Sequence, residues 1–354
     1  MRTTTLPRPP VILEQALEDP DVLLGILERQ SPHPMTLAGA EFAESRAYLR
    51  AGARTGDVPP FVQVVDGEPR IPPVFRTTWG AEEQAVPGAD VIVNNPRFID
   101  AARRLYDAEV VRPYFTYVNI NAPAGQYERH TDIPAFRGIG RDRYPTWLLN
   151  CMLHSGCFDR WRLKIATAVC WYYEGTGGEF TYWPEGWDGE QVVIDPPYNY
   201  GVMGDNDYMP HRVERIGGPG DHPKYGFDAT IRLTSLSSSN SLSSGKSLNG
   251  LSSLSSLTPE RQWVIEEPGH SPVVHAFDEV RVSLSWKAFV FTDDHEAEVF
   301  DQRLDDLDEA TLVATLAEDC ARRGVSVPEG PDALSDPEFG DKVRDVYLSS
   351  DLRF

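Results

Sequence analysis

The hydrophobic pattern in the middle of the chain is that of many short β-strands. From residue 113 to about 216, short runs rich in Val, Ile, Tyr, Trp and Thr alternate with Gly, Pro and Asp. The clearest runs are Tyr114–Ile120, Ile165–Tyr173, Glu179–Trp183 and Gln191–Ile194. Residues 280–292 form one more strong run. Short strands at this spacing, separated by turn residues, predict a β-barrel or a β-sandwich.

The two ends of the chain follow a helical spacing instead. Apolar residues recur there on one stripe or are interleaved with acidic positions, which is typical of amphipathic helices. This spacing predicts helices over residues 11–30, 40–50, 97–110 and 308–323. The stretch 51–95 between them is rich in Pro and Gly and holds two short β-like runs, Phe61–Val65 and Asp90–Val93.

These patterns divide the chain into three parts. We expect a helical and mixed N-terminal segment (1–112), a mainly β core (113–293) and a helical C-terminal extension (294–354). Residues 235–256 are a low-complexity run dominated by Ser, which cannot bury a stable core. We therefore expect a disordered surface loop inserted into the core. A lid over the functional site is the alternative, since long loops in compact domains are often functional.

The charge balance narrows the class of partner. The 354-residue chain has a formal net charge of −21 and holds no cluster of Lys and Arg. A nucleic-acid binder needs a basic face that displaces counterions, so we expect no nucleic-acid partner. We expect the acidity to serve solubility, although it would also favour a cationic substrate. No apolar run is long enough to cross a bilayer, and the first ten residues lack the apolar core of a signal peptide. The sequence thus predicts a cytoplasmic protein with no membrane partner, and it leaves the oligomeric state open.

The strongest chemical signal is the tripeptide His130-Thr131-Asp132. It lies on a predicted strand, where side chains two residues apart face the same way, so the imidazole and the carboxylate lie side by side. With a second, distant His, this pair forms a facial triad that suits non-haem Fe(II) and leaves positions open for oxygen chemistry. His211 is the favoured third ligand, and His270 and His275 are its rivals.

A second metal cluster is conceivable at Cys151, His154 and Cys157, which follow one another at intervals of three. On a helix, these side chains would fan over about a third of the circumference. We therefore expect buried thiols beside a surface His rather than a metal site. The spacing of the four cysteines does not indicate a disulfide framework.

Together, these motifs resemble the Fe(II)/2-oxoglutarate-dependent oxygenases, in their prolyl-4-hydroxylase-like and phytanoyl-CoA-hydroxylase-like branch. Tyr127-x-x-His130-x-Asp132 is similar to the proximal motif of that family, and His211-Arg212-Val213 is similar to its distal motif. Arg281 opens a run similar to the strand whose Arg pairs with the far carboxylate of 2-oxoglutarate. The resemblance covers about 113–292 and implies a mainly β fold with helical additions around a double-stranded β-helix (jelly-roll, cupin-like) core.

The resemblance also implies the cofactors. Fe(II) would be held by His130, Asp132 and His211, with 2-oxoglutarate as co-substrate and O2 as oxidant, and no catalytic residue is expected beyond the metal centre. Arg281 would bind 2-oxoglutarate, with Asn121 and Ser283 beside it. The charges agree with this assignment: Fe(II) and one Asp leave a net charge of +1, the 2-oxoglutarate dianion takes the site to −1, and one buried Arg restores neutrality. Arg also suits a planar carboxylate through its bidentate fork.

One spacing departs from the pattern of the family, whose Arg usually follows soon after the distal His. Here Arg281 follows His211 by 70 residues. The Ser-rich segment lies in this interval, so an insertion explains the distance. Arg232 and, less well placed, Lys287 are alternative partners for 2-oxoglutarate.

The function implied is the oxidation, most simply the hydroxylation, of a small molecule with release of succinate and CO2, as in the tailoring of natural products. Desaturation, ring closure and epoxidation start from the same chemistry. Two other classes stay open at this point. One is a metal-dependent enzyme on the same barrel that does not use 2-oxoglutarate, and the other is a non-catalytic binding module.

Overall fold

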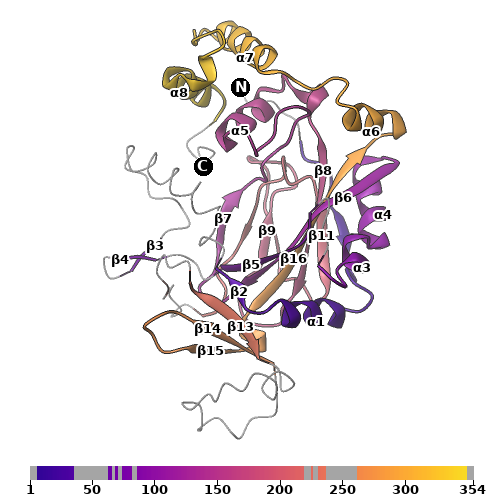
Figure 1. Cartoon of the computed structure of the whole chain (residues 1–354), viewed down its shortest axis with the longest axis vertical. Coiled ribbons are helices and arrows are strands. Elements are labelled where there is room, and N and C mark those ends of the chain that lie inside the picture. The colour runs from indigo at the N-terminus through magenta and orange to yellow at the C-terminus, as the bar shows by residue number, and fades with distance from the viewer. Residues whose placement is uncertain are drawn as a thin grey trace, which may run out of the picture.

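The fold of the protein is mainly antiparallel β-sheet, with helices along one side and at one end (Figure 1). A computed structural model describes residues 6–35, 63–65, 68–70, 74–81, 86–218, 225, 230–236 and 261–348. The mainly β class predicted from the hydrophobic pattern is confirmed. The helix predicted over 40–50 lies outside the described residues.

The larger of the two main sheets has six antiparallel strands in the order β1-β11-β8-β16-β6-β5. These strands are β1 (Val11–Leu13), β5 (Val74–Ala81), β6 (Val110–Asn121), β8 (Lys164–Tyr172), β11 (Tyr200–Gly204) and β16 (Arg281–Phe291). β16 lies at the centre, paired with β8 on one side and β6 on the other. Because β1 and β5 extend its edges, this sheet draws strands from both sides of residue 113.

The smaller main sheet has four antiparallel strands in the order β10-β9-β12-β7. These strands are β7 (Tyr127–His130), β9 (Phe180–Tyr182), β10 (Val192–Ile194) and β12 (His211–Val213). From β6 onward the chain passes back and forth between the two sheets: β6, β8, β11 and β16 join the larger sheet, and β7, β9, β10 and β12 join the smaller one. This alternation brings segments far apart in sequence to face one another across a common interior.

A third sheet takes three of its four strands from the part of the chain between His211 and Arg281. Its order is β15-β14-β13-β2. The strands are β2 (His33–Pro34), β13 (Arg232–Leu236), β14 (Gln262–Glu266) and β15 (Val273–Ala276). The sheet lies at one end of the molecule, at the bottom of Figure 1. The expected start of the Ser-rich loop is wrong, because Ser235 and Leu236 pair with Trp263 and Gln262 in β14. Residues 237–256 lie outside the described residues. A separate hairpin is made by β3 (Gln63–Val65) and β4 (Glu68–Arg70).

The helices lie outside the sheets. They are α1 (Asp21–Gln30), α3 (Asp90–Val93), α4 (Pro96–Tyr106), α5 (Thr146–Ser155), α6 (Asp294–Asp301), α7 (Glu309–Arg322) and α8 (Pro337–Tyr347). Short 3-10 turns occur at Asp159–Trp161, Phe277–Glu279 and Ala333–Ser335. The helices predicted over 97–110 and 308–323 are confirmed. No described helix combines the length and the apolar character that a membrane crossing needs.

Two of the predicted elements are wrong. The helix expected over 11–30 begins only at Asp21, and Val11–Leu13 instead pair with β11 as an edge strand. The apolar residues of this stretch belong first to the strand β1 and then to the helix α1, which begins directly after Pro20. The β-like run Asp90–Val93 is a helical turn, in which Val93 N–H donates to Ala89 O at 2.9 Å. Packing of Ile92 into the core overrides the β-preference of its neighbours.

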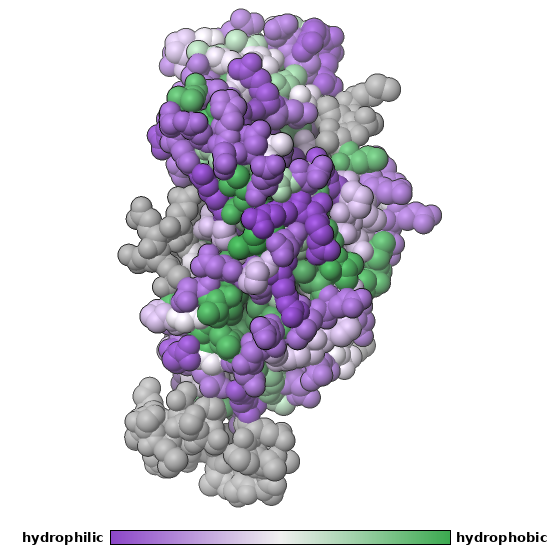
Figure 2. All heavy atoms as spheres, turned by 90° about the vertical axis from the view of Figure 1, so that its right-hand side faces the viewer, coloured by the Kyte–Doolittle hydropathy of each residue, from purple (hydrophilic) through white to green (hydrophobic). Residues whose placement is uncertain are grey.

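The outer face of the larger sheet packs on α3 and α4. Trp286 of β16 is fully buried there, its indole N–H donates to Val93 O at 2.7 Å, and its ring lies 5.5 Å from that of Phe98 in α4. A second apolar cluster holds α5, α7 and α8 together at the opposite end from the third sheet (Figure 1). Figure 2 shows the side covered by α4, where hydrophilic residues predominate and hydrophobic ones are interspersed. With this face covered, the inner face of the larger sheet is left to line the site.

Candidate metal centre and cavity

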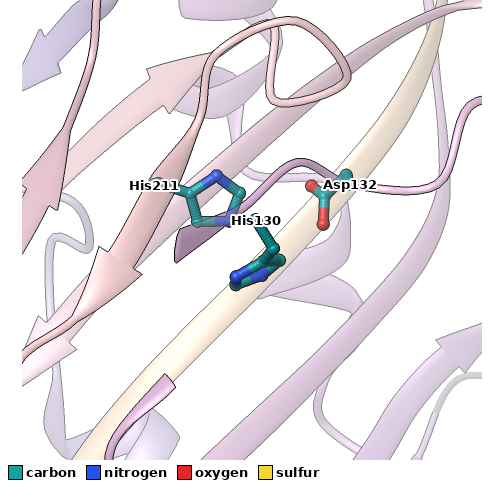
Figure 3. Close-up of side chains that lie close together, drawn as sticks. All are labelled: His130, Asp132 and His211. Atoms are coloured by element: carbon teal, nitrogen blue, oxygen red, sulfur yellow. The ribbon is translucent and has the colours of Figure 1, made fainter. Parts of the chain in front are cut away.

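Three potential metal ligands converge between the two main sheets (Figure 3). His130 ends β7 and His211 begins β12, and the two are direct partners across that antiparallel pair. Their ring centroids are 4.4 Å apart. With Asp132, each side chain offers one ligand atom, and these atoms lie within 4.8 Å of one another. Within the described part of the chain, no other group of three or more His, Cys, Asp or Glu side chains comes together in this way.

Asp132 reaches this place by a different route from the one expected. The expectation that it shares a strand with His130 is wrong, because β7 ends at His130. The main-chain N–H of Asp132 donates instead to Asn206 O, at 2.9 Å, in the turn after β11. This hydrogen bond replaces the sheet ladder and fixes the backbone so that the carboxylate faces the two imidazoles (Figure 3).

Both imidazoles are oriented by main-chain carbonyls. Nδ1 of His130 lies 2.7 Å from Glu128 O, and Nδ1 of His211 lies 3.0 Å from Met209 O. A carbonyl only accepts, so each Nδ1 carries the hydrogen, and Nε2 is the ring nitrogen that a metal would bind. Burial, reinforced by His130, lowers the pKa of His211 to about 4, which keeps that ring neutral near pH 7. Two imidazoles and one carboxylate form a donor set that fits Fe(II) with open positions.

Lys287 of β16 lies beside the candidate ligands, a contact that the sequence did not reveal. Its ammonium donates to Asp132 Oδ2 at 2.8 Å, and the hydroxyl of Thr167 reaches the same oxygen at 3.4 Å. Burial alone would raise the pKa of Asp132, but the charges of Lys287 and His211 hold it well below its usual value. Among the described residues nothing hydrogen-bonds to Oδ1, so this oxygen remains for a metal.

Replacing Lys287 by Met is expected to destabilise the metal-free protein by about 2–3 kcal/mol, since it leaves the Asp132 carboxylate without its counter-charge. Breaking a fully buried ion pair typically costs about 3–5 kcal/mol. The loss expected here is smaller because the side chains of Lys287 and Asp132 are 12% and 18% exposed. Mn(II) should recover more stability in Lys287→Met than in the wild type, because the ion supplies the missing positive charge. Urea denaturation with chelator and with Mn(II) measures both effects.

Lys164→Met is the matched control for this experiment. Lys164 pairs with Glu296 at 3.0 Å on a more exposed part of the surface, where an ion pair contributes little. Unfolding curves of Lys287→Met that coincide with those of the wild type under both conditions would contradict the expected role of Lys287.

A cavity of about 550 Å³ opens in front of the three ligands, between the two main sheets. Alternate side chains of β16 form its floor: Arg281, Ser283, Ser285, Lys287 and Phe289. The smaller sheet contributes Tyr127, Phe180 and Val213. Three alternatives raised by the sequence, Arg232, His270 and His275, are not among the described residues that line this cavity.

Arg281 lies at the end of the cavity where β16 begins. It is only 1% exposed, and among the described residues no hydrogen bond reaches its Nε or Nη2. Burial lowers its pKa to about 10, so the guanidinium is still a cation near pH 7. Gly178, at φ +78°, makes room for it, because a Cβ there would lie 2.8 Å from Arg281 Cδ. A buried cation without a hydrogen-bonded partner fits an anionic ligand.

The other two residues predicted to bind the co-substrate lie near Arg281 in different ways. Ser283 is buried and lines the cavity. Asn121 is the cross-strand partner of Arg281 and is fully buried, but it is not among the lining residues. Asn119, two residues earlier on β6, does line the cavity.

The Cys151, His154, Cys157 group lies apart from this cavity. Cys151 and His154 are on α5, and Cys157 follows it. The expectation that His154 is a surface residue is wrong: it is 8% exposed, because α5 packs against α7 and α8. The three side chains do not approach one another closely enough to be a metal site.

Comparison with known proteins returns structures of the 2OG-Fe(II) oxygenase family. A Pseudomonas putida prolyl-4-hydroxylase is 12% identical and aligns over 80% of this chain and 94% of its own, with a TM-score of 0.34. HygX from Streptomyces hygroscopicus, solved with nickel and 2-oxoglutarate, is 8% identical. It aligns over 80% of this chain and 83% of its own, with a TM-score of 0.35. A Burkholderia pseudomallei oxidoreductase of the 2OG-Fe(II) oxygenase family is 10% identical. It aligns over 70% of this chain and 80% of its own, with a TM-score of 0.31.

No protein-family model and no curated protein sequence matches the chain. At such low identities and TM-scores, the case for a function has to come from the residues of this chain.

Proposed function

We propose that the protein is an Fe(II)/2-oxoglutarate-dependent oxygenase that oxidises a small molecule. The observation that carries this proposal is the pairing, in one cavity, of the His130, Asp132, His211 group with the buried guanidinium of Arg281. A metal site alone would fit many chemistries. A second, cationic anchor fits a co-substrate that binds the metal at one end and carries a carboxylate at the other.

In this proposal the residues have separate tasks. The Nε2 atoms of His130 and His211 and Oδ1 of Asp132 hold Fe(II), and Arg281 holds the far carboxylate of 2-oxoglutarate, with Ser283 beside it. When bound, the metal with 2-oxoglutarate and O2 supplies an oxidation that releases succinate and CO2. The chain itself fixes the ligand orientations through Glu128 O and Met209 O, and it surrounds the site with the two sheets.

The topology supports a double-stranded β-helix for the core. Eight strands, β6–β12 and β16, divide equally between two facing sheets. This division is the arrangement of a jelly roll. The third sheet then interrupts the core between β12 and β16, which accounts for the long interval before Arg281. We propose the core as residues 113–293, flanked by the N-terminal segment and the C-terminal helices.

Anaerobic titration with Fe(II) and 2-oxoglutarate tests the proposed function. We expect a weak visible charge-transfer band that needs both components and disappears in His130→Ala. His270→Ala is the matched control, since His270 is an exposed His outside the cavity. If intact, folded protein never shows the band, the oxygenase proposal fails. The protein would then be either a metal-dependent enzyme that does not use 2-oxoglutarate or a non-catalytic binding module.

A further inference from the structure

Two of the three candidate ligands depend on a single turn. The 205–210 turn connects β11 to β12. Asn206 O accepts the main-chain N–H of Asp132 at 2.9 Å, and Met209 O lies 3.0 Å from Nδ1 of His211. A displacement of this turn would therefore move the Asp132 carboxylate and the His211 ring together.

The 205–210 turn is buried along its whole length. Most connecting segments run over the surface, because a buried loop has to find partners for its polar groups inside the protein. Part of this need is met within the turn, where Asp205 O accepts the N–H of Tyr208 at 3.0 Å and that of Met209 at 2.8 Å. The side chains of Asp205 and Asp207 add two carboxylates, which need a partner outside the turn.

Arg162 is that partner. One of its guanidinium nitrogens, Nη2, donates to Asp205 Oδ1 at 2.5 Å and to Asp207 Oδ2 at 3.2 Å. Its Cζ also lies 4.4 Å from the centroid of the Tyr208 ring. The side chains of this ion cluster, Arg162, Asp205 and Asp207, are only 11%, 3% and 1% exposed. A single arginine thus contacts three residues of the turn.

The backbone of Arg162 is itself joined to the segment that follows Asp132. Arg162 forms an isolated β-bridge with Phe136, and the N–H of the neighbouring Leu163 donates to Ala135 O at 2.9 Å. Asp132 therefore lies between two points that depend on the same residue. Its own N–H is held through the turn, and the chain shortly after it is held by the main chain around Arg162.

Stability alone does not explain an ion cluster at this buried place. Taking charges out of water is costly, and apolar side chains of similar volume are often as stabilising or more so. An arginine bonded to two carboxylates does, however, fix where these groups lie relative to each other. Metal ligands have to be held within about 0.5 Å of their working geometry by groups that are themselves locked in place. The ion cluster does this for the turn that orients Asp132 and His211.

Building on the proposed function, we propose that Arg162 is a positioning residue of the metal centre. Through its two aspartate partners it holds the 205–210 turn at the place where two main-chain oxygens orient Asp132 and His211. Arg162 is not among the described residues that line the cavity. Its effect on metal binding therefore passes through the turn.

Arg162→Gln is expected to weaken Mn(II) binding about tenfold, the lower end of the 10–100-fold effect of losing a partner of a metal ligand. Gln removes the charge and is too short to reach both carboxylates. Mn(II) alone, without 2-oxoglutarate, is titrated and followed by electron paramagnetic resonance. While the variant stays folded, its metal affinity does not depend on the free energy of unfolding. A residue that only stabilised the fold would leave this affinity unchanged.

The absorption spectrum of the Co(II)-saturated protein gives a second measurement. At saturation, its bands report the geometry of the ligands and not the affinity. We expect the bands of Arg162→Gln to differ from those of the wild type in position or intensity. Arg162→Lys, which keeps the charge and a donor for the carboxylates, should lie between the two in both measurements.

Arg137→Gln is the matched control, because it makes the same substitution at a similarly buried arginine. Arg137 is 7% exposed and donates to Asp305 at 2.7 and 2.9 Å, in the segment between α6 and α7. The variant should lower the free energy of unfolding. It should keep the Mn(II) affinity and the Co(II) spectrum of the wild type.

Asp205→Ala tests the same contact from the side of the turn, should Arg162→Gln fail to fold. It removes the shorter of the two bonds, leaves Asp207 beside Arg162, and keeps the main-chain oxygen of residue 205. Asp205→Ala should weaken Mn(II) binding more than Asp205→Asn, which keeps an oxygen for Arg162.

Three results would overturn the proposal. One is a folded Arg162→Gln or Asp205→Ala that matches the wild type in Mn(II) affinity and Co(II) spectrum. The second is an equal loss of metal affinity in Arg137→Gln, and the third is a wild type that binds no Mn(II). Failure of the oxygenase proposal has a different signature. The wild type would then bind Mn(II) but show no charge-transfer band with Fe(II) and 2-oxoglutarate.

Discussion

Alanine in place of His211 is expected to abolish stoichiometric Fe(II) binding and to lower turnover at least about a hundredfold. Loss of even an outer partner of a metal ligand costs about 10–100-fold, and His211 is one of only three protein ligands in the proposed site. The buried ring is neutral near pH 7 because burial lowers its pKa to about 4, so its removal leaves no unpaired charge. The variant should therefore fold. Metal content of the purified protein and anaerobic Fe(II) titration measure the effect.

His275→Ala is the control for His211→Ala. His275 was a rival ligand in the sequence, but it lies on β15 near Glu279 and outside the described lining of the cavity. It should bind Fe(II) as the wild type does. If His211→Ala retained one tightly bound iron per chain, the assignment of this residue as a ligand would be wrong.

Arg281→Gln is expected to weaken 2-oxoglutarate binding by about 10–100-fold while Fe(II) binding persists. A hydrogen bond to a charged group contributes about 1.5–3 kcal/mol, and a guanidinium can donate two to one carboxylate. Gln keeps much of the volume but removes the charge. Calorimetric titration of 2-oxoglutarate into the Fe(II)-loaded protein without O2 measures the change.

Two further variants sharpen the result for Arg281. Gly178→Ala should weaken 2-oxoglutarate binding in the same direction, because the added Cβ would lie 2.8 Å from Arg281 Cδ and displace the side chain. Arg232→Gln should have no effect, since Arg232 lies on β13 of the third sheet. Unchanged affinity and turnover in Arg281→Gln would favour a metal enzyme that does not use 2-oxoglutarate.

Local sequence patterns were sufficient for most strands of the core and for the helices α4 and α7. The run at 280–292 alternates apolar residues with Arg, Ser and Lys up to position 287 and is apolar from there to Phe291, and it forms β16, the central strand of the larger sheet. Its alternation also placed Arg281, Ser283 and Lys287 on one face, and all three line the cavity. Such predictions succeed because the period of a strand is set by the backbone itself.

Features that depend on contacts between residues far apart in the chain could not be predicted from the sequence. Val11–Leu13 form a strand only because β11 offers an open edge, and Asp132 leaves its strand because Asn206 O accepts its N–H. The third sheet was missed because β13, β14 and β15 are short, and the low-complexity segment separates the first two. Lys287 was considered for 2-oxoglutarate, and nothing in the sequence indicated its bond to Asp132.

The orientation of both imidazoles by main-chain oxygens has a consequence for how this protein can diverge. The acceptors belong to Glu128 and Met209, each two residues before its histidine. Because every residue type carries the same carbonyl, the side chain at the exposed position 128 can be exchanged without disturbing the tautomer of His130. Met209 is buried in an apolar cluster, so its exchange is restricted by packing and not by the hydrogen bond to His211. Mutational drift, or a library built for a new substrate, can therefore randomise position 128 next to the metal while the metal-binding geometry is inherited intact.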